Sequence, residues 1–343
     1  MVDEAVHSPE MRRSAAALLG TAHPAFAFPP LLCPFAAVPN HPAVEELIEH
    51  TIEWTTARGL LPDEPGAVAK ARSHGMLAAR CYPAAPFDRL AIISDFINWL
   101  LSDDACENLS LDGAPPREIH RFLSRIYTVI GVPDVQLQNG DSRDELFTQA
   151  LRDIWSRITR ASTPQWRRRF ASHVRNYIEG CVWEAANRQV EQVPSRAVYL
   201  SMRSYTSGMY LFWDLIEFTG DFLLPDTVVE NPLVVELARA ANMVVALSND
   251  IFSLHKESSS GDIHNIVIVL QQEEALTREE ACLRAAGLHD AQVRHYCALE
   301  KLLPSFGSEI DRDLARYCEG MRVWMRANDD WSRATPRYNP GRP

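Results

Sequence analysis

Three acidic residues lie close together in the segment Ser102-Asp103-Asp104-Ala105-Cys106-Glu107. On a helix, Asp103 and Glu107 lie about 40° apart, and Asp104 lies within about 100° of either. Neighbouring carboxylates repel one another unless a cation joins them, and carboxylate oxygens are good ligands for hard divalent cations. The segment is therefore a candidate metal site. The alternative is a solvated acidic end of a helix.

A second set of oxygen-bearing side chains, Asn249, Ser253 and Glu257, follows a spacing of four residues. Such a set drifts by about 80° over about 12 Å, so it lines one stripe of a single helix. Amide, hydroxyl and carboxylate oxygens suit Mg²⁺ better than zinc or copper. Lys256, one of only three lysines in the chain, stands beside the stripe. The alternative is an amphipathic helix whose polar residues face water.

Both sets follow segments that are apolar along nearly their whole length, residues 90–101 and 233–247. A helix that is apolar all round is normally buried, so we expect both helices at the centre of a bundle. In an antiparallel or splayed bundle their polar ends could face each other across the mouth of one cavity. Mg²⁺ ions held there would need an anionic ligand, and a diphosphate is the natural candidate.

The rest of the chain favours an all-α fold. Strand-like alternation is scarce, and glycine is low at 15 of 343 residues. We expect an irregular, proline-rich leader over residues 1–30 and one domain over residues 31–343, since no Gly/Ser-rich linker divides the chain. Helical spacing of apolar residues occurs over residues 41–58, 66–80, 87–105, 116–131, 141–160, 163–190, 195–217, 230–257, 262–273, 277–287, 289–304 and 308–328.

Charge and composition argue against several classes of protein. With 34 basic and 45 acidic residues the net charge is −11, whereas a general nucleic-acid-binding protein should be basic. No apolar run approaches the roughly 18 to 20 residues of a membrane span, so we expect no stable membrane insertion. The seven cysteines are odd in number and lack a CxxC pair, which favours buried thiols in a reducing cytoplasm.

Together the motifs resemble those of the bacterial-type class I terpene synthases (terpene cyclases). Asp103-Asp104-x-x-Glu107 is similar to the family's aspartate-rich motif, and Asn249-Asp250-x-x-Ser253-x-x-Lys256-Glu257 is similar to its NSE triad. Arg203 stands 46 residues before Asn249, where the family has an arginine that senses the diphosphate. Trp331 and the pair Arg337-Tyr338 match the family's C-terminal motif.

The chain departs from the family pattern at three places. The third acid is Glu107 rather than Asp, and Leu100 stands where many relatives have an aromatic residue. Thr206 and Ser207 follow the sensor arginine, where some relatives carry Asp and Gly. We expect these differences to affect the identity of the product more than the reaction class.

The resemblance implies a helical bundle of the class I terpenoid synthase fold around a central apolar cavity. It implies an enzyme that uses three Mg²⁺ ions to ionise a linear isoprenyl diphosphate and then cyclises the cation to a terpene hydrocarbon or alcohol. Its expected metal ligands are Asp103, Glu107, Asn249, Ser253 and Glu257, with Asp104 and Asp250 orienting the ligands or pairing with arginine.

The resemblance also implies roles around the substrate. We expect the diphosphate to be bound by Arg203, Lys256, Arg337 and Tyr338. We expect the carbocation to be enclosed by Phe96, Trp99 and Trp331 and by the backbone at Ser207 and Gly208. Relatives further suggest a homodimer.

Several alternatives remain open from the sequence. The fifteen-carbon farnesyl diphosphate is the expected substrate because it is the most frequent one, and the twenty-carbon geranylgeranyl diphosphate is the alternative. A chain-elongating prenyltransferase is disfavoured, since that family usually carries two DDxxD-like motifs and the second motif here is Asn/Ser/Glu. A non-catalytic helical binding protein is disfavoured because every expected ligand position is filled.

Overall fold

The helices expected from apolar spacing are present in the computed structural model, which describes residues 28–61, 66–101, 116–131, 143–335 and 337–338. These ranges contain no strand, so the all-α prediction is confirmed. The helices are α2 (Val44–Ala57), α3 (Ala67–Cys81), α4 (Phe87–Leu101), α5 (Pro116–Gly131), α6 (Arg143–Arg160), α7 (Pro164–Gln189), α8 (Arg196–Thr206), α9 (Met209–Gly220), α10 (Asp226–Val229), α11 (Pro232–Ser260), α12 (Ile266–Glu274), α13 (Arg278–Glu300) and α14 (Ser308–Ala334).

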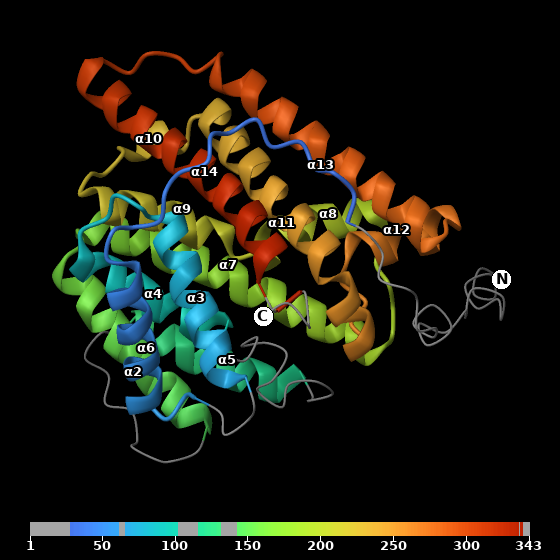
Figure 1. Ribbon diagram of the computed structural model, residues 1–343, viewed down its shortest axis with the longest axis horizontal. Coiled ribbons are helices and arrows are strands. Elements are labelled where there is room, and N and C mark those ends of the chain that lie inside the picture. The colour runs from blue at the N-terminus through green and yellow to red at the C-terminus, as the bar shows by residue number, and fades with distance from the viewer. Residues whose placement is uncertain (1–27, 62–65, 102–115, 132–142, 336, 339–343) are drawn as a thin grey trace, which may run out of the picture.

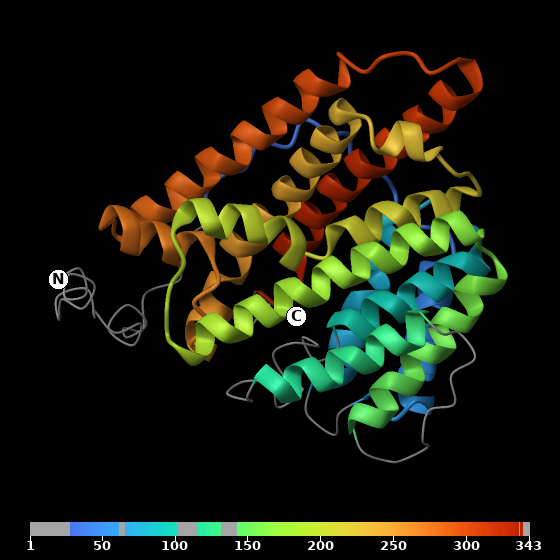
Figure 2. The same cartoon turned by 180° about the vertical axis from the view of Figure 1, so that it is seen from behind.

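The helices form two groups on either side of the long helix α7 (Figures 1 and 2). The first group contains α2 to α6, and the second contains α8 and α11 to α14. Helix α9 joins the groups because it packs against α4, α7, α11 and α14. Helix α14 also reaches across to α3. Among the described residues, no helix has both the length and the apolar character needed to cross a bilayer.

The two apolar helices are buried, as predicted. Every residue of α4 from Leu90 to Leu100 is buried. Helix α11 begins at a cap in which the Asn231 side chain accepts a hydrogen bond from the Leu233 amide, with Pro232 at the first helical position. It runs for 29 residues, and its segment from Ala240 to Ser248 is buried without interruption. Helix α11 therefore passes through the core and carries its polar end to one side of the bundle.

The predicted helix over residues 195–217 is divided into α8 and α9. The break lies at Ser207 and Gly208, and Gly208 has a φ of +69°. This left-handed conformation costs glycine little and other residues about 1–2 kcal/mol. The glycine therefore permits the chain to end one helix and start the next without a loop between them.

A second difference lies near the C-terminal end, where two predicted segments, residues 277–287 and 289–304, form the single helix α13. Gly287 lies inside it, and a glycine within a helix costs only about 1 kcal/mol relative to alanine. The side chains of Thr277 and Glu280 form a capping box that fixes where this helix begins. The free energy gained when the inner face of α13 is buried against α11 exceeds the cost of Gly287 in the helix.

Of the leader expected over residues 1–30, the structure describes only residues 28–30. Residues 28–43 form no helix and lie along the second group of helices (Figure 1, blue). The amide of Leu32 donates to Asp290 Oδ1 at 2.9 Å, and Arg326 Nη1 donates to the carbonyl of Phe35 at 3.2 Å. The first 27 residues lie outside the described ranges.

Buried charges hold α7 against α9. Arg169 Nε donates to Asp214 Oδ1 at 3.1 Å, and its Nη2 contacts Glu217 Oε2. Both acids are almost completely buried, and Glu217 Oε1 also accepts the Leu224 amide at 2.7 Å. Removing one partner of a buried pair leaves the other charge uncompensated. The resulting loss of folding free energy is larger than the net stabilisation that the intact pair provides.

Glu217→Gln removes the charge but keeps the shape of the side chain. We expect it to lower the free energy of unfolding by at least about 2 kcal/mol, because Arg169 loses a charged partner. Urea denaturation followed by circular dichroism measures the change. Glu49→Gln on the exposed face of α2 is the matched control and should change stability by less than about 0.5 kcal/mol. Equal effects of the two substitutions would refute the role of the buried pair.

Candidate active site

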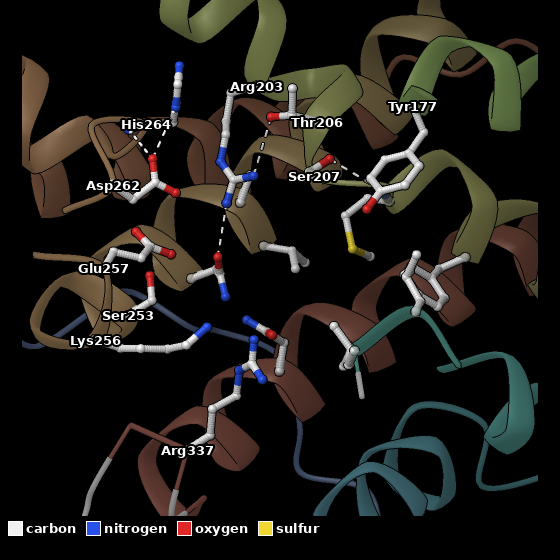
Figure 3. Close-up of a pocket in the computed structure, with 18 of the residues that line it drawn as sticks. Tyr177, Arg203, Thr206, Ser207, Ser253, Lys256, Glu257, Asp262, His264 and Arg337 are labelled. Atoms are coloured by element: carbon white, nitrogen blue, oxygen red, sulfur yellow. Dashed lines mark hydrogen bonds and ion pairs between the residues drawn. The ribbon is translucent and has the colours of Figure 1, made fainter. Parts of the chain in front are cut away.

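A cavity opens between α7, α8, α11 and α14, and it encloses about 1230 Å³ including its open mouth. Figure 3 shows charged side chains on one side of this cavity and Tyr177 on the other. The polar side chains that line it include Arg188, Arg203, Asn249, Ser253, Lys256, Glu257, Asp262, His264, Arg337 and Tyr338. The apolar and aromatic ones include Leu77, Leu100, Tyr177, Met209, Phe212, Trp324 and Trp331.

The stripe on α11 faces this cavity. Asn249, Ser253, Glu257 and Lys256 all line it, so the predicted grouping on one helix face is present. The Ser253 hydroxyl is buried and has no hydrogen-bond partner of regular geometry among the described residues. Glu257 Oε2 accepts a hydrogen bond from the side-chain Nδ2 of Asn265 at 2.8 Å.

Arg203 reaches the same cavity from α8. Its Nε donates to Asp250 Oδ1 at 3.0 Å, and its Nη2 donates to Asn249 Oδ1 at 2.9 Å. Burial by itself lowers the pKa of Arg203, but the charges of Asp250 and its neighbours more than compensate, and the net pKa rises. The guanidinium is therefore a permanent positive charge at the polar side of the cavity.

Asp250 does not line the cavity and is fully buried. Besides Arg203, its carboxylate accepts hydrogen bonds from the Tyr199 hydroxyl at 2.6 Å and from the Ile266 amide at 3.0 Å. All of these contacts hold neighbouring chain segments rather than a ligand. This geometry agrees with an orienting residue that pairs with arginine.

The C-terminal motif closes the site from the opposite side. Arg337 lies across the cavity from Arg203 (Figure 3), and the Tyr338 hydroxyl accepts a hydrogen bond from Asn249 Nδ2 at 2.7 Å. The ring of Trp331 meets that of Tyr338 edge to face at 5.8 Å. Trp331 is itself fixed by a hydrogen bond from its Nε1 to the Ser73 carbonyl at 3.0 Å.

Sequence reasoning missed part of the polar lining. Arg188, Asp262 and His264 line the cavity, and Figure 3 shows Asp262 beside Glu257. His264 Nδ1 lies 3.1 Å from Asp262 Oδ1, and Arg188 Nη1 lies 3.7 Å from Asp262 Oδ2. Burial alone would raise the pKa of Asp262, but His264 and Arg188 lower it below its usual range. The available signal was the position of Asp262 and His264 directly after the α11 stripe.

The residues on α11 fit a divalent cation. Burial and the charges of Asp262 and Asp250 raise the pKa of Glu257, so its carboxylate lies in surroundings that a cation would relieve. The Ser253 hydroxyl interacts with the Glu257 carboxylate but has no hydrogen bond of regular geometry among the described residues, so its oxygen can turn to a cation beside that carboxylate. No group of three His, Cys, Asp or Glu side chains with metal-binding geometry occurs in the described ranges. The predicted ligands Asp103 and Glu107, with Asp104, lie outside those ranges.

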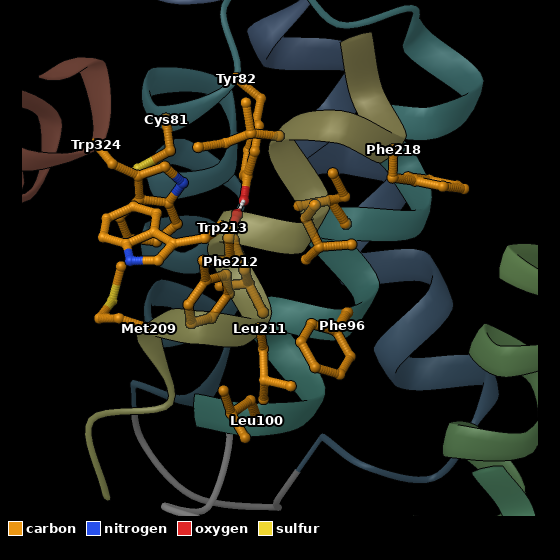
Figure 4. Packing of buried hydrophobic residues seen from close by; sticks show 14 of the residues in the cluster. Cys81, Tyr82, Phe96, Leu100, Met209, Leu211, Phe212, Trp213, Phe218 and Trp324 are labelled. Carbon is orange, nitrogen blue, oxygen red and sulfur yellow. Dashed lines mark hydrogen bonds between the residues drawn. The ribbon is translucent and has the colours of Figure 1, made fainter. Parts of the chain in front are cut away.

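Phe96 and Trp99 do not line this cavity, contrary to the prediction. They line a small apolar void next to it, and their ring centroids stack 5.9 Å apart. Figure 4 shows Phe96 in the buried cluster near Leu211. The reason is the rotation of α4: Leu100 and Leu101 face the cavity, and the two aromatic residues turn toward α6 and α7. The location of Phe96 and Trp99 just before the acidic motif was therefore not enough to predict which residues face the cavity.

The helix break meets the cavity at Ser207. Its side chain lines the cavity, and its hydroxyl donates to Asn242 Oδ1 at 2.8 Å. Gly208 is the next residue, and its α-carbon faces Tyr177 and Leu100. The predicted pair thus lies where the polar and apolar parts of the cavity lining join.

Comparison with known proteins shows which proteins the chain is similar to. The family model described as "Terpene synthase family 2, C-terminal metal binding" matches residues 95–295. The chain is 53% identical to 10-epi-cubebol synthase of Sorangium cellulosum, an alignment that covers 90% of this chain and 97% of that protein. It is 32% identical to (+)-T-muurolol synthase ((2E,6E)-farnesyl diphosphate cyclizing) of Roseiflexus castenholzii, covering 90% and 93%. The solved SVS_A2 protein from ancestral sequence reconstruction has a TM-score of 0.76 at 28% identity, covering 90% of both chains.

Asp250→Asn removes the charge that balances Arg203. We expect the free energy of unfolding to fall by about 3 kcal/mol, because a buried guanidinium loses its counter-charge. Thermal and urea denaturation without added metal measure this change. Asp88→Asn, on the exposed first turn of α4, should cost less than about 1 kcal/mol. A loss at Asp250 no larger than that of the control would show that the pair does not organise the site.

Proposed function

Because the chain belongs to terpene synthase family 2, we propose that it uses Mg²⁺ to ionise farnesyl diphosphate and cyclises the carbocation to a sesquiterpene hydrocarbon or alcohol, releasing diphosphate. One observation carries the proposal: oxygen ligands, four cationic side chains and apolar walls converge on a single cavity. The choice of farnesyl diphosphate follows the Roseiflexus relative, which is named as a synthase that cyclises this substrate.

In this proposal, two motifs hold the Mg²⁺ ions. Asn249, Ser253 and Glu257 would hold one Mg²⁺ ion, and Asp103 and Glu107 would contribute to holding the other two of the three expected ions. When bound, the ions supply positive charge to the diphosphate oxygens and so favour its departure. Asp104 is proposed to orient ligands at the first motif, as Asp250 orients Arg203 at the second.

Side chains of this chain then bind and balance the leaving group. Arg203 can make two parallel hydrogen bonds to phosphate oxygens, as can Arg337, while Lys256 adds a compact charge. The Tyr338 hydroxyl, already held by Asn249, can donate a further hydrogen bond. Negative charge grows on the diphosphate as its bond to carbon breaks, so donors fixed beforehand stabilise the transition state more than the ground state.

The apolar walls protect the carbocation. Aromatic faces stabilise positive charge and exclude water, and Phe212, Trp324 and Trp331 line the cavity. Phe96 and Trp99 support this wall from behind, since the ring of Phe96 lies 6.1 Å from that of Phe212. The helix break at Ser207 and Gly208 is proposed to present its backbone carbonyl to the cation.

The remaining parts of the proposal rest mainly on the resemblance. We propose that residues 31–343 form one catalytic domain, that the protein acts as a homodimer, and that it works in the cytoplasm. The six cysteines in the described ranges are all free thiols, which agrees with a reducing compartment. Light scattering after size-exclusion chromatography tests the dimer.

Ser253→Ala tests whether Ser253 is a metal ligand or a residue that stabilises the fold. Because the hydroxyl has no hydrogen-bond partner of regular geometry among the described residues, we expect stability without metal to stay within about 0.5 kcal/mol. We expect kcat/KM with Mg²⁺ to fall at least about 100-fold, since a metal ligand is lost. Ser259→Ala, on the exposed face of the same helix, is the control and should retain activity. Unchanged activity of Ser253→Ala would remove Ser253 from the metal site.

A product assay tests the function directly. We expect the purified protein with Mg²⁺ to convert farnesyl diphosphate to a cyclic fifteen-carbon product, detected by gas chromatography with mass detection, and EDTA to abolish the product. Geranyl and geranylgeranyl diphosphate are assayed in parallel. Longer prenyl diphosphates on addition of isopentenyl diphosphate would instead indicate a prenyltransferase. Absence of product from every substrate would overturn the proposal.

A further inference from the structure

The turn that follows α14 fixes the backbone of the C-terminal motif. Helix α14 ends at Ala334, and the Thr335 amide donates to the Trp331 carbonyl at 2.8 Å. The chain then turns back on itself. The Arg337 amide donates to the Thr335 hydroxyl at 3.3 Å, and the Tyr338 amide donates to the Thr335 carbonyl at 3.4 Å. Thr335 therefore sets the path of the backbone that brings Arg337 and Tyr338 to the cavity.

The side chain of Thr335 is anchored on a distant part of the chain. It is buried, and its hydroxyl lies 2.8 Å from the hydroxyl of Ser73 on α3, so that either group can donate. The Ser73 hydroxyl also accepts a hydrogen bond from Trp331 Nε1 at 3.0 Å, in addition to the one that the Ser73 carbonyl accepts. One serine thus contacts both the last turn of α14 and the turn that follows it.

Helix α3 provides a fixed support for these contacts. The residue after Ser73 is His74, which is buried and whose Nδ1 lies 2.9 Å from the side-chain oxygen of Asn98 on α4. Gly75 follows, and a methyl group there would lie 3.3 Å from the α-carbon of Ile48 on α2. Because α3 is held against both α2 and α4, a group bonded to Ser73 is held in place as well.

Arg337 and Tyr338 depend on the turn because they lie beyond the end of α14. Arg337 reaches the cavity in Figure 3, and the Tyr338 hydroxyl is held there by Asn249. A binding residue that is in place for only part of the time lowers the apparent affinity for its ligand by that fraction. The hydrogen bonds of Thr335 therefore influence how well Arg337 and Tyr338 bind a ligand.

We propose that Ser73 and Thr335 are positioning residues, and that the contact between their hydroxyls, here called the hydroxyl clasp, holds Arg337 and Tyr338 in the geometry that binds a diphosphate. This inference rests on the proposed function, because it takes Arg337 and Tyr338 as diphosphate-binding residues. Neither Ser73 nor Thr335 is among the residues that line the cavity. Their effect on the ligand is therefore transmitted through the turn.

Variants of the two residues test the hydroxyl clasp. Thr335→Val removes the hydroxyl and keeps the shape of the side chain, whereas Thr335→Ser keeps the hydroxyl. Ser73→Ala removes the other hydroxyl and leaves the Ser73 carbonyl to hold Trp331. The double variant combines Ser73→Ala with Thr335→Val. Thr56→Val is the matched control, since Thr56 is exposed on α2, bonds only to its own helix in the described ranges and does not line the cavity.

Two quantities are measured on the full chain, after circular dichroism has confirmed that each variant is folded. Calorimetry gives the dissociation constant of inorganic diphosphate in the presence of Mg²⁺, which reports on the diphosphate site without any hydrocarbon chain. Brief digestion with trypsin, followed by mass spectrometry, gives the rate of cleavage between Arg337 and Tyr338. This rate reports how often the turn opens.

We expect Thr335→Val to raise the cleavage rate at least about fivefold and the dissociation constant at least about threefold, because the bonds to Ser73 and to the Arg337 amide are lost. Ser73→Ala should change both quantities in the same direction. The double variant should exceed Thr335→Val by less than about twofold, since both substitutions break the same contact. Thr335→Ser and Thr56→Val should stay within about 1.5-fold of the wild type.

Several results would overturn the inference. Unchanged cleavage in Thr335→Val would show that the hydroxyl clasp does not hold the turn, and faster cleavage with unchanged affinity would show that the turn does not position the diphosphate-binding residues. Equal losses in Thr335→Val and Thr335→Ser would show that the hydroxyl is not the group that matters. If Thr335→Val does not fold, Ser73→Ala decides by the same criteria.

The product assay separates this inference from the proposed function. If the wild type forms no terpene but loses affinity for diphosphate on Thr335→Val, the proposed reaction fails and the hydroxyl clasp stands. If the wild type forms a sesquiterpene and all variants bind diphosphate equally well, the hydroxyl clasp fails and the reaction stands. A wild type that does not bind diphosphate in Mg²⁺ would overturn the inference whatever the product assay shows.

Discussion

The buried ion pair between Asp250 and Arg203 organises the polar half of the cavity. Neither charge could be buried alone at an acceptable cost, so each fixes the position of the other. The carboxylate also holds Tyr199 on α8 and the Ile266 amide at the start of α12, which joins three chain segments at one point. Through Arg203 Nη2 the same pair orients Asn249. The side chain proposed to bind metal is thus positioned, through Arg203, by its neighbour in sequence, which does not line the cavity.

The two halves of the cavity need different physical properties, and α11 lies along both. Its buried middle segment packs in the core, and its later turns carry Asn249, Ser253 and Glu257 toward the charged side. The break at Gly208 brings α9 across the apolar side, where Phe212 contributes to the wall. Charged groups and hydrocarbon surface are therefore separated along the cavity. A ligand with one anionic end and one apolar end fits such a cavity in a single orientation.

Much of the fold could be predicted from the sequence, because apolar spacing identifies helices and continuous apolar character identifies buried ones. The same periodicity grouped Asn249, Ser253 and Glu257 correctly, since neighbours on one helix are fixed by helix geometry alone. The mistaken placement of Phe96 and Trp99 had a different origin. Which face of α4 meets the cavity depends on how α6, α7 and α9 pack against it, and no local pattern contains that information. Arg188 was missed for the same reason, since it belongs to α7 and reaches the site only through tertiary packing.

The contact between Trp331 and Ser73 has a consequence for the order in which the protein folds. Its partners are separated by 258 residues, and Asn249 likewise depends on Tyr338 for the hydrogen bond from its amide nitrogen. Contacts between residues so distant in sequence form late, because the intervening chain must first be ordered. During synthesis, the helices of the first group can assemble while the cavity remains open on one side. The cavity closes only after residues 337 and 338 have been made. A partly synthesised chain would therefore have the helices that surround the cavity but lack Arg337 and Tyr338, which complete its lining.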